Sequence, residues 1–537
     1  MSRWQRYWFA SGGRWSAAIV RIAIASAVLL TLLRISHEGS NGDVAGAHTL
    51  YRPVGIWMLL GQTPPPGWLV HALWIIAVTT SITMWLGLST RASTALSFVS
   101  ALAITSLSFS ASEHWSHQYN VVFIAQCAFL GAHGGDVLSL DWIVRTLRGL
   151  PALDRPRAYQ WSLRLVQLAV AVMFACAAFH KLLHGHFTLR WALSDNLRHQ
   201  LLVRFDLAGL ARPPLVSWLI DDPWRYRTAA VLNLVSQAAP LVACFMVRRP
   251  VWRAVFGGFF LVETVALAYI VDLWNPHWLA LFAVFIDWDW LLRRHLPDTR
   301  DTRDTRDPDP PPSWSQPRGA RSFVIAFVIY DLLTALVPSL DQRLNTYPFS
   351  GFPMFSTILA KPPYAGHSAY VVVGDHFDVT ADPPIDLPTQ RWFDHSNRGM
   401  FEERDPVKLG KRLAAMWKQA VRRYPETAFH RIRLYLTMFE APAYPEPAHF
   451  EPHPIAVVGE LDDAGTFRTM VGPWEPNKIT LHAIGVTAGD ATLGYYKDDE
   501  PVLRPFTGTL DGDPVYTVAT TGGVPWLVSS HAAWKWQ

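Results

Sequence analysis

Long apolar runs, repeated along the first two thirds of the chain, restrict its fold more than any other feature of the sequence. A helix of about 20 mostly apolar residues crosses the hydrocarbon core of a bilayer. Such runs lie at residues 17–36, 67–88, 93–111, 119–135, 161–182, 228–247, 252–273, 277–293 and 321–340. Half of the 537 residues are hydrophobic. The sequence therefore predicts an all-α polytopic membrane bundle of about nine transmembrane helices.

Arginines mark one side of this predicted bundle. Cytoplasmic loops of membrane proteins carry an excess of arginine and lysine. If nine spans alternate, the arginines before the first span and after the second, fourth, sixth and eighth spans all lie on one side. These are represented by Arg14, Arg91, Arg145, Arg248 and Arg293. We therefore expect a multi-pass protein of a bacterial inner membrane, with a cytoplasmic N-terminus and an extracytoplasmic C-terminal region.

Beyond the eighth run the chain changes in character. Residues 297–320 include three Asp-Thr-Arg repeats and a proline run, and this composition predicts a disordered linker between a bundle of residues 1–296 and the last span at 321–340. Residues 341–537 have β-rich patterns and one helical pattern, so they predict an extracytoplasmic α+β domain. The strand patterns lie at 370–373, 431–437, 455–458, 479–484 and 515–518, and the helical pattern lies at 406–423.

One lysine is isolated within the predicted bundle. Lys181 is the only lysine before Lys361. Arginine keeps its proton in proteins, whereas a lysine in an apolar site can release it, so Lys181 is a candidate base. The alternative is a structural lysine that extends from a helix end to the membrane interface. The segment after it, Thr188–Phe205, has leucines at spacings of four and predicts an amphipathic helix that lies in the interface or caps the bundle.

Further polar residues interrupt the apolar runs. His114 and His117 are three residues apart, so they share a helical face and could bind a metal or a substrate oxygen; the alternative is an ordinary interfacial role. Glu263 lies inside the seventh run. A carboxylate at membrane depth usually faces a cavity or a partner, and Lys181 and Arg21 are candidate partners.

Other signals are weaker. Asn233 and Gln237, one turn apart in the sixth run, are explained most simply as contacts between helices. His277 lies in the tight turn before the eighth run and is either part of a site or an anchor of that turn. The three cysteines form no metal or disulfide pattern, and a net charge of +4 is small for this length. The sequence predicts neither a metal site nor a nucleic-acid partner.

The stretch around Lys181 resembles a known family. Lys181-Leu182, Trp191 and Asn196-Leu197-Arg198-His199 resemble a segment of the horizontally transferred transmembrane (HTTM) domain, which vitamin K-dependent γ-glutamyl carboxylase shares with bacterial relatives. The segment 115–119, followed by 138–141, resembles the histidine-containing run of that family. The resemblance covers roughly residues 15–295.

The resemblance implies a carboxylase-like enzyme, a lyase that uses a reduced, vitamin K-like quinone. In that family the matching lysine deprotonates the quinol, whose oxidation to the epoxide accompanies carboxylation of a glutamate. Lys181 would then be the base, and His117 would assist it. The candidate substrate-binding residues are His114, Trp191, Asn196, Arg198, His199, Glu263 and His277. The expected partners are membrane lipid, a quinone and a protein or peptide substrate. The alternative is a non-enzymatic membrane protein that binds lipid, or binds a partner through its outer domain.

Overall fold

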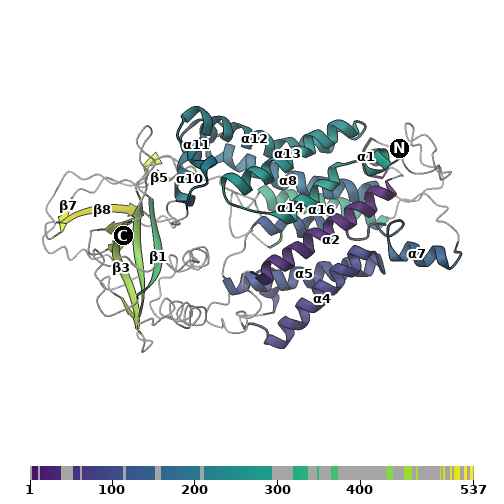
Figure 1. The fold of residues 1–537 in the computed structure, drawn as a ribbon, viewed down its shortest axis with the longest axis horizontal. Coiled ribbons are helices and arrows are strands. Elements are labelled where there is room, and N and C mark those ends of the chain that lie inside the picture. Colours follow the sequence, from purple (N-terminus) through teal and green to yellow (C-terminus); the bar gives the residue numbers. More distant parts are fainter. Residues whose placement is uncertain are drawn as a thin grey trace.

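The helical part of the chain is a bundle whose long axis runs from the N-terminus toward α10 and α11 (Figure 1). In this computed structural model the described residues are 3–9, 13–37, 53–60, 63–112, 117–150, 159–205, 211–292, 318–336 and 347–349, together with the strands given below. The predicted linker at 297–320 lies outside the described residues except for 318–320, which are helical. His114, the predicted helix at 406–423 and the predicted strand at 479–484 also lie outside them.

Seven helices of the described part are long and apolar enough to cross a membrane. They are α2 (Arg14–His37), α4 (Gly67–Leu86), α5 (Thr90–Ser112), α8 (Gln160–His184), α12 (Pro223–Phe245), α13 (Pro250–Ile270) and α16 (Arg318–Leu336). Each coincides with one of the predicted spans. Their length and composition support a multi-pass helical membrane protein.

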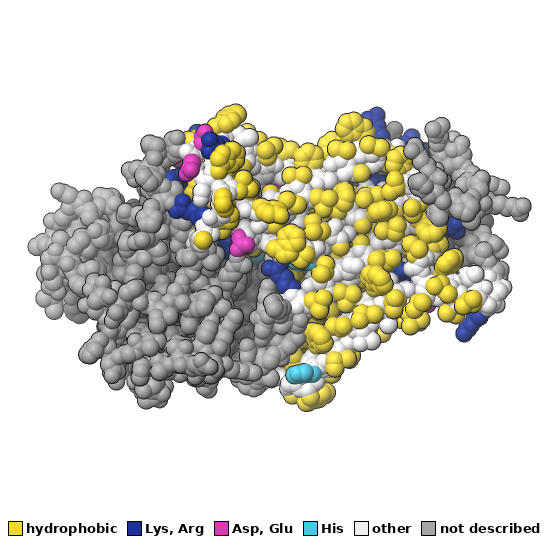
Figure 2. Space-filling view, viewed as in Figure 1, with side chains coloured by type: hydrophobic (Ala, Val, Ile, Leu, Met, Phe, Trp, Pro, Cys, Tyr) yellow, Lys and Arg dark blue, Asp and Glu magenta, His cyan; other side chains and the backbone are white. Residues whose placement is uncertain are grey.

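The surface of the bundle agrees with that assignment. Large apolar side chains are exposed on the long helices, including Ile75 of α4, Val99 of α5, Leu232 of α12, Val262 of α13 and Ile329 of α16. Figure 2 shows hydrophobic side chains across the middle of the visible face and arginine and lysine toward its ends. So large an exposed apolar surface is unfavourable in water and is suited to lipid.

The predicted span at 119–135 is not one long helix. Its helical part is α6 (Asn120–Ala128), which follows the short turn η2 (His117–Tyr119). Nine residues of helix rise about 14 Å, roughly half of the hydrocarbon thickness. The helix ends in a turn that requires Gly131 in the left-handed region, with φ of +76°. Glycine is suited to that conformation because it has no Cβ.

The predicted span at 277–293 is also interrupted. It consists of α14 (Pro276–Leu281), η3 (Phe282–Phe285) and α15 (Trp288–Leu292), with extended backbone at Ile286. This segment nevertheless passes along the whole of α2. Arg34, near the end of α2, donates to the carbonyl of Trp274, and Asp289 accepts from the backbone N–H of Ser16 near its start, at 2.9 Å.

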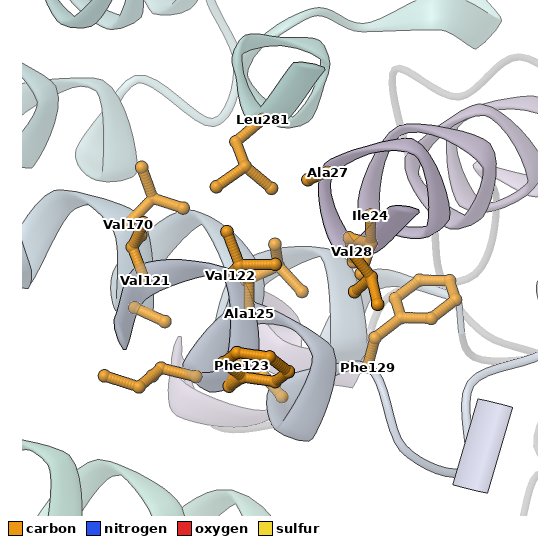
Figure 3. Packing of buried hydrophobic residues seen from close by; sticks show 14 of the residues in the cluster. Ile24, Ala27, Val28, Val121, Val122, Phe123, Ala125, Phe129, Val170 and Leu281 are labelled. Atoms are coloured by element: carbon orange, nitrogen blue, oxygen red, sulfur yellow. The ribbon is translucent and has the colours of Figure 1, made fainter. Parts of the chain in front are cut away.

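The short helix α6 lies at the centre of the hydrophobic core. Eight of its nine residues are buried. Val121, Val122 and Phe123 of α6 pack beside α2, α8 and α14, as seen for Val28 and Val170 in Figure 3. Close packing of this kind holds membrane helices together, because lipid and side chains are equally apolar.

Arg21 joins the 134–138 loop to the last turn of α4 at the end of the bundle where α2 begins, which we call the amino-terminal end. Its guanidinium is fully buried and donates to the carbonyls of Gly134 (2.9 Å) and Leu138 (2.5 Å). It also donates to the carbonyl of Trp85, at 3.4 Å. A planar guanidinium satisfies several acceptors at once, so Arg21 fixes the 134–138 loop against the end of α4.

The segment between α8 and α12 contains three short helices: α9 (Arg190–Leu193), α10 (Asn196–Phe205) and α11 (Pro214–Ile220). The predicted single amphipathic helix at 188–205 was therefore wrong, because the chain is extended at Ser194. The predicted apolar face was wrong in its first half as well: Leu189 and Leu193 are exposed, whereas Trp191 is buried. The segment packs on α12, so it caps the bundle.

The C-terminal strands are antiparallel. One sheet has the order β1-β2-β3-β4 and a second the order β10-β9-β8-β7, while β5 and β6 form a separate pair. The bounds are β1 (Tyr364–Val372), β2 (Arg431–Phe439), β3 (His453–Asp462), β4 (Phe467–Thr469), β5 (Tyr496–Lys497), β6 (Glu500–Pro501), β7 (Gly508–Leu510), β8 (Asp513–Ala519), β9 (Pro525–Val528) and β10 (Ala533–Lys535). Their assembly into one extracytoplasmic domain stays a prediction.

The remaining short helices are α1 (Arg3–Phe9), η1 (Gly55–Leu59) and α7 (Leu140–Leu147). Trp8 and Phe9 of α1 and Trp57 of η1 are buried in the hydrophobic core of the bundle. Tyr7 of α1 donates to the carbonyl of Cys244 at 3.0 Å, and Trp57 of η1 donates to the carbonyl of Ala103 at 2.8 Å. The helix α7 has no buried residue.

Candidate functional site

Lys181 lies in the last turn of α8 and points into the bundle. Only 1% of its surface is exposed. Its Nζ donates to Oε1 of Gln237 on α12 at 2.8 Å, and it lies 4.7 Å from the centre of the Trp191 ring. An ammonium over an aromatic face is stabilised by the quadrupole of the ring. Lys181 is therefore a buried group with defined contacts, and the interpretation as a lysine that reaches the interface is wrong.

Glu263 of α13 is equally buried, with 1% of its surface exposed. Its carboxylate accepts four hydrogen bonds, all at 2.8 Å and all from α12. Asn233 Nδ2 donates to both oxygens, Ser236 Oγ to Oε2 and Gln237 Nε2 to Oε1. A buried carboxylate is costly unless such donors replace water. The three α12 residues supply that replacement.

Gln237 joins the lysine to the glutamate. Its Oε1 accepts from Lys181 while its Nε2 donates to Glu263. If the amide were flipped, its Nε2 would face the Lys181 Nζ, which is also a donor, and its Oε1 would face the Glu263 carboxylate, which is also an acceptor. The two neighbours therefore fix the observed orientation of the amide. The predicted pairing of Glu263 with Lys181 is thus indirect, and Arg21, the other predicted partner, contacts loops elsewhere.

The sequence of α12 explains how one helix supplies all three donors. Asn233, Ser236 and Gln237 are at i, i+3 and i+4, which are neighbouring positions on one helical face. This face turns toward α8 and α13, the two helices with which α12 makes its most extensive contacts. Asn233 and Gln237 therefore do more than join helices, and Ser236 was missed by sequence reasoning although its spacing from them could have identified it.

Trp191 reaches Lys181 from the cap. It is buried with Ala178 of α8, Ala192 of α9, and Ala230 and Leu234 of α12. The small alanines leave room for the indole between α8 and α12. Lys181 is thus enclosed by an apolar wall on one side and by the polar face of α12 on the other.

A second group of predicted residues meets at η2 and α14. Nε2 of His277 lies 3.2 Å from the carbonyl oxygen of Gln118, which also accepts from Nε1 of Trp278 at 2.6 Å. The His277 ring stacks on Tyr119, with centres 5.0 Å apart. The predicted role of His277 as an anchor of its turn fits these contacts. His117 begins η2 and is half-buried; no hydrogen bond joins it to Lys181 in the described part of the chain.

Asn196, Arg198 and His199 are all buried in α10. The residue before them, Asp195, accepts from Tyr226 Oη at 2.6 Å and from Arg227 Nη2 at 2.8 Å. Burial alone would raise the pKa of Asp195, but these two hydrogen bonds and the charge of Arg227 lower it below its ordinary value. Asp195 therefore attaches the start of α10 to α12 as a carboxylate.

His180 of α8 and Asp331 of α16 are among the buried polar residues that sequence reasoning missed. Both are less than 5% exposed. Cys176 of α8 and Ala335 of α16 pack together beside them. Adjacent residues leave a helix on different sides, so His180 and Lys181 face different neighbours: α16 and α12.

Within the described residues, no group of three histidine, cysteine, aspartate or glutamate side chains is arranged to hold a metal ion. Comparison of the chain with models of protein families, with curated proteins and with solved structures finds no match. Function must therefore be argued from the geometry of the residues themselves.

Proposed function

We propose that this chain is a membrane enzyme that acts on a reduced quinone, with Lys181 as the base that removes a proton from a quinol hydroxyl. The observation that carries the proposal is the environment of Lys181. It is buried at the capped end of the bundle, and Gln237 is its one hydrogen-bond partner in the described part of the chain. An amine with a single neutral partner is able to exchange a proton.

Gln237 suits this role better than a carboxylate would. An amide oxygen accepts a hydrogen bond from an ammonium and also from a neutral amine. A carboxylate in direct contact would instead favour the charged form. Glu263, placed behind Gln237, compensates the charge that Lys181 gains without contacting it. The arrangement holds Lys181 in one position in both protonation states.

The residues around Lys181 fit an aromatic diol. Trp191 supplies a flat apolar face, and Lys181 supplies a group able to take the hydroxyl proton. When bound, the reduced quinone would supply the reducing electrons of the reaction. The exposed apolar surface of the bundle agrees with a hydrophobic substrate that reaches the site from lipid.

The resemblance to the HTTM domain of vitamin K-dependent γ-glutamyl carboxylase gives the reaction class: quinol epoxidation linked to carboxylation of a protein or peptide glutamate. In this proposal His117, Asn196, Arg198 and His199 help to bind substrate, while His277 anchors its turn. The C-terminal strands belong to an extracytoplasmic domain that presents the second substrate, and the amino-terminal end of the bundle is cytoplasmic, in a bacterial inner membrane.

The test is epoxide formation by the purified full-length protein, supplied with reduced vitamin K, oxygen and bicarbonate. We expect the wild type to form the epoxide. The variant Lys181→Arg keeps the charge but not the base, so turnover should fall by roughly 10²- to 10⁴-fold. Arg225→Lys, a cation exchange at the start of α12, is the matched control and should leave turnover unchanged.

A second variant separates loss of the base from loss of the fold. Lys181→Gln removes the charge and retains a donor toward Gln237, and its thermal unfolding midpoint is measured beside that of Lys181→Arg. Turnover lost in a variant that unfolds as the wild type does supports the proposal. Equal turnover of wild type and Lys181→Arg contradicts it, and so does a wild type that forms no epoxide.

A further inference from the structure

A hollow of about 470 Å³ lies at the amino-terminal end of the bundle, remote in the fold from Lys181. The first turn of α5, the loop after α6 and the first turns of α7 form its walls. Its lining side chains include Thr90, Arg91, His133, Asp136, Asp141 and Arg145. The quinol proposal makes no use of this site.

Basic groups converge on the hollow, while its two carboxylates already have protein donors. Arg91 Nη2 lies 3.0 Å from both ring nitrogens of His133. Asp141 accepts from Ser89 N, Thr90 N and Thr90 Oγ1 at 2.7–2.8 Å. The ion pairs between described residues join other arginines to aspartates, and Arg91 takes part in none of them. Arg91 therefore offers its charge to an outside anion.

Asp136, the second carboxylate, is engaged in a similar way. It accepts from Tyr159 Oη at 2.6 Å. A carboxylate that is hydrogen-bonded to the protein competes less for an arginine than a free one does. The anion expected at this site must bring its own negative charge and several acceptor oxygens, which is the chemistry of a phosphate ester.

The helix α7 shows where the hollow lies relative to lipid. Asp141 and Arg145, one turn apart, line the hollow, whereas Ile143 and Leu147 are exposed, Leu147 to 81%. A short helix with one charged and one apolar face is typical of a segment that lies flat in the membrane interface. Its first turn is fixed to the α4–α5 turn, since Asp141 N donates to the carbonyl of Gly87 at 3.0 Å.

Exposed apolar surface continues from the hollow along the neighbouring spans. Trp85, Leu86 and Leu88 are exposed at the end of α4, and Leu96 and Val99 are exposed on α5. Acyl chains that lie against these two helices would bring a headgroup to the level of Arg91. Charge and apolar surface together therefore select an occupant with a phosphate and acyl chains.

We propose that this hollow is a binding site for an anionic phospholipid. The phosphate lies between Arg91, His133 and Arg145, and the acyl chains lie along α4 and α5. In this arrangement α7 acts as a lipid-facing side wall of the site.

Native mass spectrometry of the full-length protein tests the site. The protein is equilibrated with equal amounts of phosphatidylglycerol and phosphatidylcholine, and the retained lipids are counted. We expect the wild type to retain phosphatidylglycerol preferentially. Arg91→Gln should weaken this preference about fivefold, and the double variant with Arg145→Gln should weaken it further. Each basic residue near a membrane strengthens its attraction to anionic lipid by about that factor.

Arg249→Gln is the matched control. It removes an exposed arginine from the turn between α12 and α13, away from the hollow. A preference that falls in Arg91→Gln and persists in Arg249→Gln supports a built site. Equal effects of the two changes, or no preference in the wild type, overturn the proposal. Inorganic phosphate is the last arm: if it displaces phosphatidylglycerol at equal concentration, the acyl chains contribute nothing and a lipid site is wrong.

Discussion

Lys181 and Glu263 are two buried, oppositely charged side chains that the amide of Gln237 separates. Lys181 Nζ donates to Gln237 Oε1 at 2.8 Å, and Gln237 Nε2 donates to Glu263 Oε1 at 2.8 Å. A direct ion pair would hold its proton firmly and would need no third residue. The interposed amide keeps the two charges close while leaving Lys181 with capacity for further hydrogen bonds. The first two predictions follow from this relationship.

Replacing Gln237 by leucine should destabilise the bundle. The change removes the acceptor of Lys181 and one of the donors to Glu263 without altering the volume greatly. Hydrogen bonds to charged groups contribute about 1.5–3 kcal/mol each, so we expect the loss of two to lower the free energy of unfolding by about 3–6 kcal/mol. Denaturant unfolding in detergent measures it.

Thr264→Val is the control for that change. Thr264 is also buried on α13, next to Glu263, but its hydroxyl bonds only to the carbonyl of Phe260 on its own helix. Its loss should cost no more than about 0.6 kcal/mol, the average for side-chain hydrogen bonds between membrane helices. If Gln237→Leu costs no more than Thr264→Val, Gln237 does not join the two charges.

A double-mutant cycle of Lys181→Met and Glu263→Gln should show that the two charges are coupled although they do not touch. Each single change leaves the other residue as a buried charge without its counterpart, and the double change removes both. We expect a coupling of about 1–3 kcal/mol in the free energy of unfolding. Additive effects within experimental error would mean that Glu263 does not compensate the charge of Lys181.

The long helices were predictable because length and apolar composition suffice to define a membrane span. The same criterion failed at 119–135 and 277–293, where the apolar runs are long but the helices are short. Gly131 ends the first turn after α6, and Ile286 is extended after η3. Both segments are surrounded by other helices, so their irregular backbone finds protein partners instead of lipid. Apolar composition carries no information about this burial.

The candidate site was predictable only in part. Lys181 and Glu263 could be identified because charges are rare in apolar runs. Gln237 was identified as a polar residue of its run, but its position between the two charges could not be predicted, since spacing along α12 defines a face and not the helix opposite it. The cap was predicted from leucines at spacings of four. The residue that packs the cap against α8 and α12 is instead Trp191. The helix is interrupted at Ser194, and Leu189 and Leu193 are exposed. Tertiary contacts with α12 outweighed the local pattern.

Gly87→Ala should be costly because of Arg21 and Ser139. A Cβ at Gly87 would lie 2.2 Å from Arg21 Nη1 and 2.4 Å from Ser139 Cβ, and the residue has φ of +70°. Gly131 has a similar φ of +76°, but its nearest neighbour would be 3.9 Å away. Gly131→Ala should therefore lower the free energy of unfolding only by the strain of placing alanine in the left-handed region, about 1–2 kcal/mol. Gly87→Ala also displaces the buried guanidinium.

The comparison of these two glycine variants by thermal unfolding measures the combined cost of the contacts with Arg21 and Ser139. In an Arg21→Lys background the shorter cation leaves room, so Gly87→Ala should lose the part of its additional cost that comes from Arg21, while the contact with Ser139 Cβ remains. An equal cost for Gly87→Ala and Gly131→Ala in the wild type would show that the 134–138 loop adapts to the new Cβ.

The attachment of the cap should depend on pH through Asp195. Hydrogen bonds from Tyr226 and Arg227 outweigh burial and hold the pKa of Asp195 below its ordinary value of 3.8. A carboxyl with a lowered pKa stabilises the folded state above that ordinary value, and the stabilisation is lost as the pH falls below it. The protein should therefore lose stability below about pH 4. Asp195→Asn should be less stable than the wild type at pH 7 and should lose less between pH 5 and pH 3, as measured by unfolding midpoints. Parallel pH profiles for the two proteins would show that Asp195 has no part in holding α10 on α12.

Asp222→Asn is the control for the Asp195 variant. Asp222 is partly exposed at the start of α12, and its side chain bonds only to Trp224 and Arg225 of the same helix.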